Sequence, residues 1–398
     1  MAALEKDHPD GAPSDACAEV LDALVEASVA VEWKESSSAL AIDWTDHESF
    51  ARPPLTPGGT CADPEASWGH RRGDHPGQHE AFYGYYLSAA TMVRQEHGQA
   101  LPELVRRITI SACDLDPVVA FIPVIERLAG SGVALGDILA DSGYAHRRAE
   151  HWALPLRSLG ARLVVELHPN DRGPKGTYAG AIIANGNLYC PATPRSLLEL
   201  GPLARGGTEE QTAAHDHQSA EAARYKLGRI CADDADGYHR VACPAVAGKL
   251  RCPARPESMT LPYSRPEVLA PPQQPPTCCQ QQTLTVPPEV TAKTAQAHDY
   301  PSKAHRDSYT RRTAVERAFS SVKDPASTDI SRGWCRVMGL TPITIFVACA
   351  FVIRNCRVLD AFQTRRKQDQ LRAAAGMPPR IRKRRRRTLT DLVTASPP

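Results

Sequence analysis

The sequence predicts an α/β protein in which a mixed sheet is flanked by helices on both faces and is interrupted by an insertion. Three apolar, strand-like segments come first, and a helix, a strand, a second helix and a further strand follow them. That order fits a mixed sheet with helices on both faces, where the strand ends supply a site. From about residue 170 to residue 297 the order breaks into Gly/Pro turns and a Pro/Gln-rich tract, and helical patterns then resume. We therefore expect an insertion inside the sheet domain.

The individual elements follow from apolar periodicity and from the residues that bound each run. A short apolar run ends at Asp43, which we expect to lie at a strand end, and the polar stretch after it, residues 52–79, is typical of a loop. Another buried-strand pattern ends at Asp141. The remaining strands are expected at 81–93, 108–113 and 162–167, and the helices at 117–128, 146–159, 305–323 and 342–362.

These elements divide the chain into five parts. They are a lead-in (1–36), the first part of the sheet domain (37–169), a Cys/Pro-rich insertion and linker (170–300), two late helices (301–364) and a basic tail (365–398). The net charge of +2 hides this tail, which holds eleven Lys and Arg residues against Asp369 and Asp391. The run Arg380 to Arg387 suits neutralisation of phosphates, although solvated disordered tails have the same composition. The charge of the tail alone does not decide whether the protein contacts nucleic acid.

Composition excludes several classes of protein. A chain of 398 residues with 42% hydrophobic and 23% charged residues is long enough to bury a core, which excludes a small disulfide scaffold. The longest apolar run, Ile343 to Ile353, ends at Arg354, so no membrane span is expected. The N-terminus lacks an export pattern, which favours the cytoplasm. The twelve cysteines are then expected to be reduced thiols or metal ligands.

Three acidic residues stand out as candidate catalytic groups: Asp43, Asp141 and Glu316. Neighbouring strand ends can bring two carboxylates together, and hard oxygen ligands suit Mg²⁺. A two-metal site for phosphoryl transfer needs such a set of carboxylates. The alternative is that each Asp simply caps a turn or a helix, which is the commoner role for an Asp after a strand.

The predicted helix that carries Glu316 has a distinctive face. Tyr309, Arg312, Glu316 and Lys323 share one side of a helix at 3.6 residues per turn. A carboxylate flanked by cations can bind a metal ion while the cations hold phosphates of a bound strand. An ordinary solvated salt-bridge face has the same spacing.

The string from Tyr309 to Lys323 matches Tyr-x2-Arg-x3-Glu-x6-Lys, a signature of one branch of bacterial insertion-sequence transposases with a DDE triad. The segments Ala41-Ile-Asp-Trp-Thr-Asp46 and Leu139-Ala-Asp-Ser-Gly-Tyr144 resemble the first and second acidic motifs of that family, in the expected order. The resemblance covers about residues 38–362. Asp46 competes with Asp43 for the first acidic position, but it is expected beyond the strand end, in the loop.

This resemblance implies a ribonuclease-H-like fold with the insertion placed before the glutamate helix. It implies metal-dependent cleavage at transposon ends and strand transfer into target DNA, with two Mg²⁺ (or Mn²⁺) ions held by Asp43, Asp141 and Glu316. Arg312 and Lys323 would then grip the DNA backbone, and Tyr309 would position a strand near the cleaved phosphate. Self-association on DNA and a place at the nucleoid are further expectations.

Three other readings stay open on sequence grounds. Only 42 residues precede the first acid, so the chain could be a truncated or inactive relic that binds DNA without cutting it. A metal-dependent nuclease on the same fold is the second, and a structural zinc protein is the third. For zinc, Cys243 and Cys252 lie nine residues apart, which is wider than typical zinc pairs, and further candidates are nearby: Cys231, His239, Cys278 and Cys279.

Overall fold

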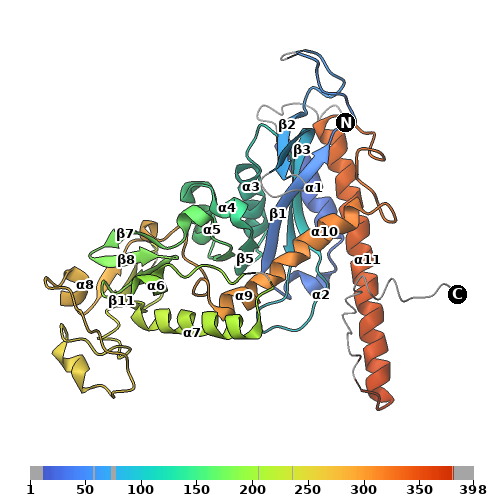
Figure 1. The fold of residues 1–398 in the computed structure, drawn as a ribbon. Helices are drawn as coiled ribbons and strands as arrows, with labels where there is room; N and C mark the ends of the chain where they lie inside the picture. The colour runs from blue at the N-terminus through green and yellow to red at the C-terminus, as the bar shows by residue number, and fades with distance from the viewer. Residues whose placement is uncertain are drawn as a thin grey trace.

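The computed structural model describes residues 12–56, 59–72, 78–204, 206–234, 236–378 and 380. Its centre is a six-stranded mixed sheet (Figure 1). The strands are β1 (Leu40–Glu48), β2 (Ser67–Arg72), β3 (His79–Met92), β4 (Val105–Ala112), β5 (Asp137–Ala140) and β6 (Arg162–Val165). Strands β1, β5 and β6 run parallel to one another, whereas β3 is antiparallel to β1, β2 and β4. The predicted mixed α/β sheet is thereby confirmed.

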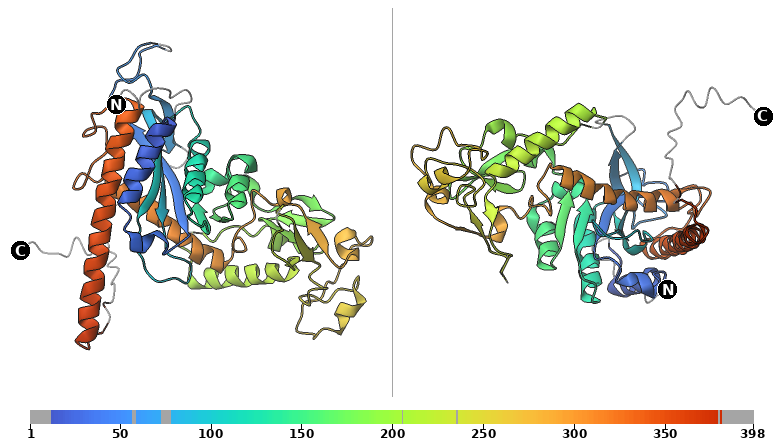
Figure 2. Two further views of the ribbon diagram at one scale, coloured as in Figure 1. Left: turned by 180° about the vertical axis from the view of Figure 1, so that it is seen from behind. Right: turned by 90° about the horizontal axis from the view of Figure 1, so that it is seen from below.

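Helices cover both faces of this sheet, as the two views of Figure 2 show. On one face α1 (Asp15–Ala27), α10 (Thr313–Lys323) and α11 (Leu340–Ala374) bury one apolar cluster, which includes Leu21, Val315 and Phe351. On the other face α3 (Pro117–Gly130), α4 (Ser142–Ala145) and α5 (Ala153–Ser158) bury a second, which includes Phe121 and Trp152. The alternation of strand side chains accounts for two separate cores, because successive residues point to opposite faces.

The structure corrects four expectations from the sequence. Asp43 is not at a strand end, because β1 continues to Glu48 along the long partner strand β3. Asp46, expected in a loop, therefore also lies within β1. The polar stretch expected to be a loop contains β2, which extends the hairpin with β3. The helix expected at 146–159 is replaced by the 3₁₀ turn Ala149–His151 and the shorter helix α5, and α4 lies just before this range.

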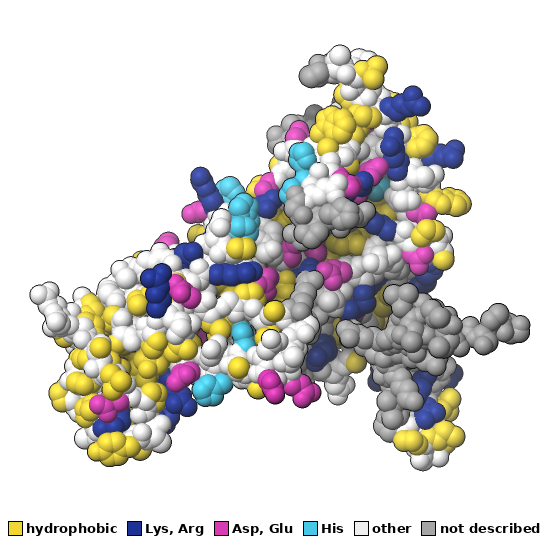
Figure 3. Space-filling view, in the orientation of Figure 1, with side chains coloured by type: hydrophobic (Ala, Val, Ile, Leu, Met, Phe, Trp, Pro, Cys, Tyr) yellow, Lys and Arg dark blue, Asp and Glu magenta, His cyan; other side chains and the backbone are white. Residues whose placement is uncertain are grey.

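The insertion between β6 and the late helices contains two small sheets. One is formed by β7 (Pro174–Tyr178), β8 (Ala181–Ala184) and β9 (Asn187–Tyr189), and the other by β10 (Gly228–Arg229), β11 (His239–Ala242) and β12 (Leu284–Val286). Between them in sequence lie α6 (Arg195–Leu198) and α7 (Glu209–Tyr225), and α8 (Thr277–Gln280) precedes β12. The 3₁₀ turns Pro169–Asp171, Pro256–Thr260 and Pro288–Val290 complete this part. Figure 3 shows hydrophobic side chains gathered over it.

After the insertion, α9 (Lys303–Tyr309) leads through the 3₁₀ turn Thr310–Arg312 into α10, and α11 ends the described fold. The remaining short helix, α2 (Val31–Lys34), follows α1. Among the described helices, α11 alone is long and apolar enough to cross a membrane. Core helices also meet that criterion, and the side chains of Ile343, Val347 and Phe351 are buried against the sheet. Residues 365–374, expected in the basic disordered tail, instead continue α11. Of the run Arg380–Arg387, Arg380 is described and pairs with Asp369, and the rest lies outside the described residues.

Candidate active site

Asp43 lies in the interior of β1, on the face that α10 covers. Ala39 and Ala41 belong to the cluster under α10, and two-residue alternation places Asp43 and Thr45 on that same face. Ala41 pairs with Leu139 of the parallel strand β5. Two residues further along both strands, Asp43 comes opposite the end of β5, where Asp141 follows.

Asp141 caps the short helix α4. Its Oδ1 accepts a hydrogen bond of 2.8 Å from the backbone N–H of Gly143. Asp141 therefore has the helix-capping role that is common for an Asp after a strand. A Cβ at Gly143 would come within 2.4 Å of the Trp44 ring, so this turn has no room for a side chain. The ring of Trp44 in turn contacts Tyr144, with 5.0 Å between centroids.

The carboxyl group of Asp43 is largely buried near two other acidic side chains. Burial raises the pKa of its carboxyl group to about 7, and the neighbouring charge of Asp141 adds to the rise. The guanidinium of Arg312 acts in the opposite direction, while Glu316 raises the pKa slightly further. The charges of Asp141 and Glu316, the other two acids predicted from the sequence, therefore both act on Asp43.

Arg312 at the end of the 3₁₀ turn and Glu316 in the first turn of α10 both reach β1, so the single helix expected at 305–323 is interrupted between Tyr309 and Glu316. The inner face of α10 buries Ala314, Val315, Ala318, Phe319 and Val322 against the sheet, which fixes the rotation of the helix. Arg312 Nη1 donates a hydrogen bond of 2.9 Å to Asp43 Oδ2, and Nη2 donates one of 2.5 Å to Glu316 Oε1. The Glu316 side chain is 49% exposed, against 14% for Asp43, so it forms the outer edge of the site.

Tyr309 lies beneath Arg312. The guanidinium carbon is 5.5 Å from the centre of the tyrosine ring, which stacks on His305 with 5.7 Å between ring centroids. Burial raises the pKa of the phenol. Tyr309 therefore supports the guanidinium from below.

Lys323 reaches the same strand two residues beyond Asp43. Its Nζ lies 2.7 Å from Thr45 Oγ1 and 3.2 Å from Asp46 Oδ1. Arg71 Nη1 lies 3.2 Å from the other carboxylate oxygen, Asp46 Oδ2. Burial raises the pKa of Asp46, but the charge of Lys323 and the hydrogen bonds from both cations outweigh it and leave the pKa lowered. Asp46 thus pairs with two cations, whereas Asp43 pairs with one, Arg312, and lies near the charges of two other acids.

As they stand, no three described His, Cys, Asp or Glu side chains are arranged to hold a metal ion. The residues nevertheless suit a hard divalent cation, because Asp43 and Asp141 offer carboxylate oxygens whose mutual repulsion a cation would relieve. Two buried polar atoms beside them, Tyr144 Oη and Arg312 Nε, have no hydrogen-bond partner among the described residues. Both are adjacent to the acids and could bind water or a substrate oxygen.

No protein-family model, curated protein or solved structure matches this chain. The site therefore rests on the residues themselves. The sequence predicted six site residues: the three acids together with Tyr309, Arg312 and Lys323. It did not predict Thr45, Arg71 or Tyr144. Thr45 and Tyr144 each lie within one of the two acidic motifs, and Arg71 lies on β2, whose polar sequence has no strand pattern.

Proposed function

We propose that this chain is a DDE transposase of ribonuclease-H-like fold, which cuts and joins DNA with divalent metal ions. The fold half of the proposal is supported by the strand order β4-β3-β1-β5-β6, in which three antiparallel strands precede two parallel ones. Two helices on the same face, α10 and α11, follow an insertion of about 130 residues, as the sequence resemblance leads us to expect.

One observation carries the functional half. The charges of Asp141, at the end of β5, and Glu316, on α10, both act on Asp43 of β1, and the Arg312 side chain bonds directly to Asp43 and Glu316. These are the acids that match the three motifs of the transposase family. An ordinary salt-bridge face would not require a buried aspartate beside a second aspartate, which is unfavourable without a cation.

The acids Asp43, Asp141 and Glu316 would hold two Mg²⁺ or Mn²⁺ ions, which when bound polarise the attacking and leaving oxygens of a phosphodiester. Arg312 neutralises two of these acids in the protein alone, and its released guanidinium could pair with a phosphate. Tyr309 keeps that guanidinium in place. Lys323 holds Asp46 and Thr45, and its 32% exposed side chain can also reach solvent beside the site.

The experiment compares the two aspartates that compete for the first acidic position. Nicking of supercoiled plasmid with Mg²⁺ or Mn²⁺ is measured for the parent, Asp43→Asn and Asp46→Asn. We expect Asp43→Asn to abolish nicking, since it removes a buried ligand, and Asp46→Asn to retain most of it. DNA binding by each protein is measured in parallel by fluorescence anisotropy.

Loss of nicking in Asp46→Asn alone would exchange the roles of the two aspartates. Equal nicking by all three proteins would contradict a role for either. If the parent binds DNA but never nicks it with either ion, the chain is the inactive relic and not the enzyme. Nicked product without joined product, when plasmid target is supplied together with the DNA that flanks the gene, would favour a simple nuclease.

A further inference from the structure

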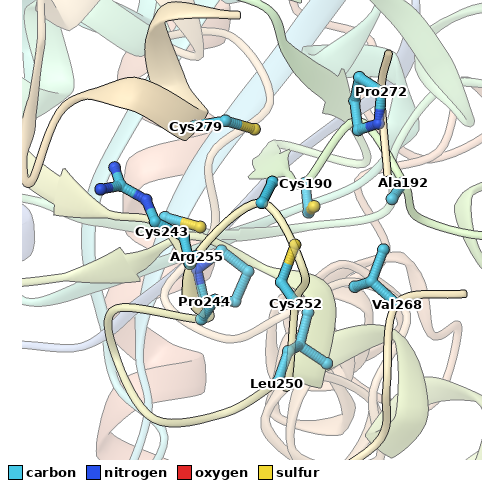
Figure 4. A pocket seen from close by; sticks show the side chains of 12 residues that line it. Cys190, Ala192, Cys243, Pro244, Leu250, Cys252, Arg255, Val268, Pro272 and Cys279 are labelled. Carbon is cyan, nitrogen blue, oxygen red and sulfur yellow. The ribbon is translucent and has the colours of Figure 1, made fainter. Parts of the chain in front are cut away.

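Four cysteines from four separate segments of the insertion line a single cavity (Figure 4). Cys190 directly follows β9, Cys243 directly follows β11, Cys252 lies in the loop after it, and Cys279 lies in α8. All four are buried, with 4 to 7% of each residue exposed, and none forms a disulfide. Reduced thiols brought together from distant parts of a chain are the usual ligands of structural zinc.

The cavity has the size of one small occupant. Its volume is about 10 Å³, and its other walls are mostly apolar, including Leu250, Val268 and Pro272. About one water molecule or ion fits in such a volume. The thiols are the main ligating groups that face it, because Arg255 is the only charged residue in the lining.

The backbone after two of these cysteines is folded to support thiolates. Cys190 and Cys252 are each followed by proline and then by alanine, and the N–H of Ala192 or Ala254 donates to the preceding sulfur. Burial raises the pKa of the Cys190 thiol to about 12, while this N–H lowers it. Such turns place amide dipoles against sulfur, which favours a ligated thiolate.

The position of the cavity gives an ion a structural role. Cys190 follows a strand of the first small sheet and Cys243 follows a strand of the second, so an ion between them would join both sheets. Each sheet has three short strands, and the small apolar clusters beside them are shared: one holds Leu188 with Val286, and the other holds Tyr189 with Cys243. Small cores of this kind usually need a metal or a disulfide for stability.

We propose that Cys190, Cys243, Cys252 and Cys279 form a tetrahedral Zn²⁺ site that ties the two sheets of the insertion together. As the described side chains stand, no three of them are arranged to hold an ion, so binding requires the thiols to turn toward a common centre. The sequence had pointed to Cys231 and His239 as well, but neither lines the cavity, and Cys231 is exposed. Cys190 was the ligand that sequence spacing missed.

The test measures metal in the full-length protein purified from zinc-supplemented medium. We expect about one zinc ion per chain by mass spectrometry of the metal, and with Co²⁺ in its place the absorption bands of tetrahedral thiolate coordination. Cys190→Ser and Cys252→Ser should each lose most of the bound zinc. Cys231→Ser, an exposed cysteine of the same insertion, and Cys335→Ser, a buried cysteine elsewhere, should keep it.

A second measurement uses only the parent protein, in case the cysteine variants fail to fold. A strong chelator added to the parent protein should lower the melting temperature and expose the thiols to a thiol reagent, and Zn²⁺ but not Mg²⁺ should reverse both changes. Parent protein that binds no zinc and gives no Co²⁺ bands would overturn the proposal. Equal zinc loss in the Cys231→Ser and Cys252→Ser proteins would overturn the assignment of these four ligands.

Discussion

Arg312 decides the charge balance of the site at the scale of single residues. Its guanidinium bonds to Asp43 and Glu316, and it is the one cation in direct contact with either acid among the described side chains. Sequence reasoning expected Arg312 to hold DNA. Its present partners are carboxylates, which a divalent cation would also bind, so Arg312 and a metal ion compete for the same oxygens.

Replacing Arg312 by Ala should therefore have opposite effects without and with metal. Without metal, the free energy of unfolding should fall by about 3 kcal/mol, because a buried carboxylate loses its partner. With Mn²⁺, the rise in melting temperature should be larger than in the parent, because no guanidinium competes for the oxygens. Urea titration and thermal melts measure the two effects.

The matched control is Arg317→Ala, one position beyond Glu316 on the same helix. Arg317 pairs with Glu103 at the surface, with 54% and 36% of the two side chains exposed. An exposed pair of this kind is worth less than about 1 kcal/mol. Identical Mn²⁺ responses in Arg312→Ala and the parent would contradict a shared site.

His305 gives the site a dependence on pH. Its ring Nε2–H donates to the backbone carbonyl of Val165 at 3.0 Å, and burial lowers the pKa of the ring to about 4. The unfolded chain, with a histidine pKa near 6.5, takes up the proton first as pH falls, so stability present above pH 6.5 is lost toward pH 4. Acid should thus loosen the helix that supports Tyr309.

The measurement is urea unfolding of the parent and of His305→Gln at pH 7 and pH 5. The parent should lose about 2 kcal/mol more between these pH values than the variant, whose amide can still donate to Val165 but does not titrate. His47, whose pKa is also lowered to about 4 by burial, is present in both proteins and cancels. Equal losses in the two proteins would show that His305 is not neutral and buried.

Among the elements, α11 is held against the edge strand β4 in part by the side-chain amide of Asn355. Asn355 is fully buried; its Oδ1 accepts from Val105 N–H at 2.9 Å, and its Nδ2 donates to Val105 C=O at 2.8 Å. β4 is an edge strand, so this side chain pairs with backbone groups that no further strand covers. The neighbouring buried Arg354 also donates through Nη1 to the backbone carbonyl of Glu103, and these polar contacts together fix the register of α11.

Asn355→Ala should lower the free energy of unfolding by about 2 to 4 kcal/mol, because it leaves a buried donor and a buried acceptor without partners. Cys356→Ala, at the exposed neighbouring position, is the control and should change it by less than about 0.5 kcal/mol. Urea titration of both variants gives the comparison. A small effect of Asn355→Ala would mean that water replaces the side chain.

The elements also show what the sequence could predict. Apolar runs and periodicity predicted β3, β4, α3, β5 and β6 close to their observed bounds, because each is held by burial of its own side chains. β2 was missed because the polar sequence SWGHRR is a strand only through its pairing with β3. Cys190 was missed as a ligand because more than 80 residues of chain separate it from Cys279, and only the tertiary fold brings them to one cavity.

At the scale of the whole molecule, the basic tail and the sheet domain are expected to share the work of binding DNA. The run Arg380 to Arg387 contains seven Lys and Arg residues, and all of them except Arg380 lie outside the described residues. Each Lys or Arg that neutralises a phosphate makes affinity fall more steeply with salt. The tail should therefore contribute affinity without sequence preference.

Deleting residues 381–398 should make the plot of log affinity against log salt concentration shallower, while the circular dichroism spectrum stays that of the parent. A full-length control with the arginines of the run changed to glutamine separates charge from length, and it should match the deletion. Fluorescence anisotropy of a labelled duplex gives the slopes. If the slope of log affinity against log salt concentration is unchanged, the tail does not contact DNA phosphates.

Asp43, Asp141 and Glu316 are proposed to act together on DNA, and DNA cleavage by the Glu316→Gln protein measures this. The substrate is a duplex that carries the DNA flanking the gene on both sides, with Mg²⁺ or Mn²⁺, and Lys323→Ala is assayed beside it. We expect metal-dependent cleavage by the parent and a loss of at least about 100-fold in Glu316→Gln with DNA affinity retained. Lys323→Ala should weaken binding first. Cleavage by Glu316→Gln at the parental rate would rule out a shared catalytic role for the three acids.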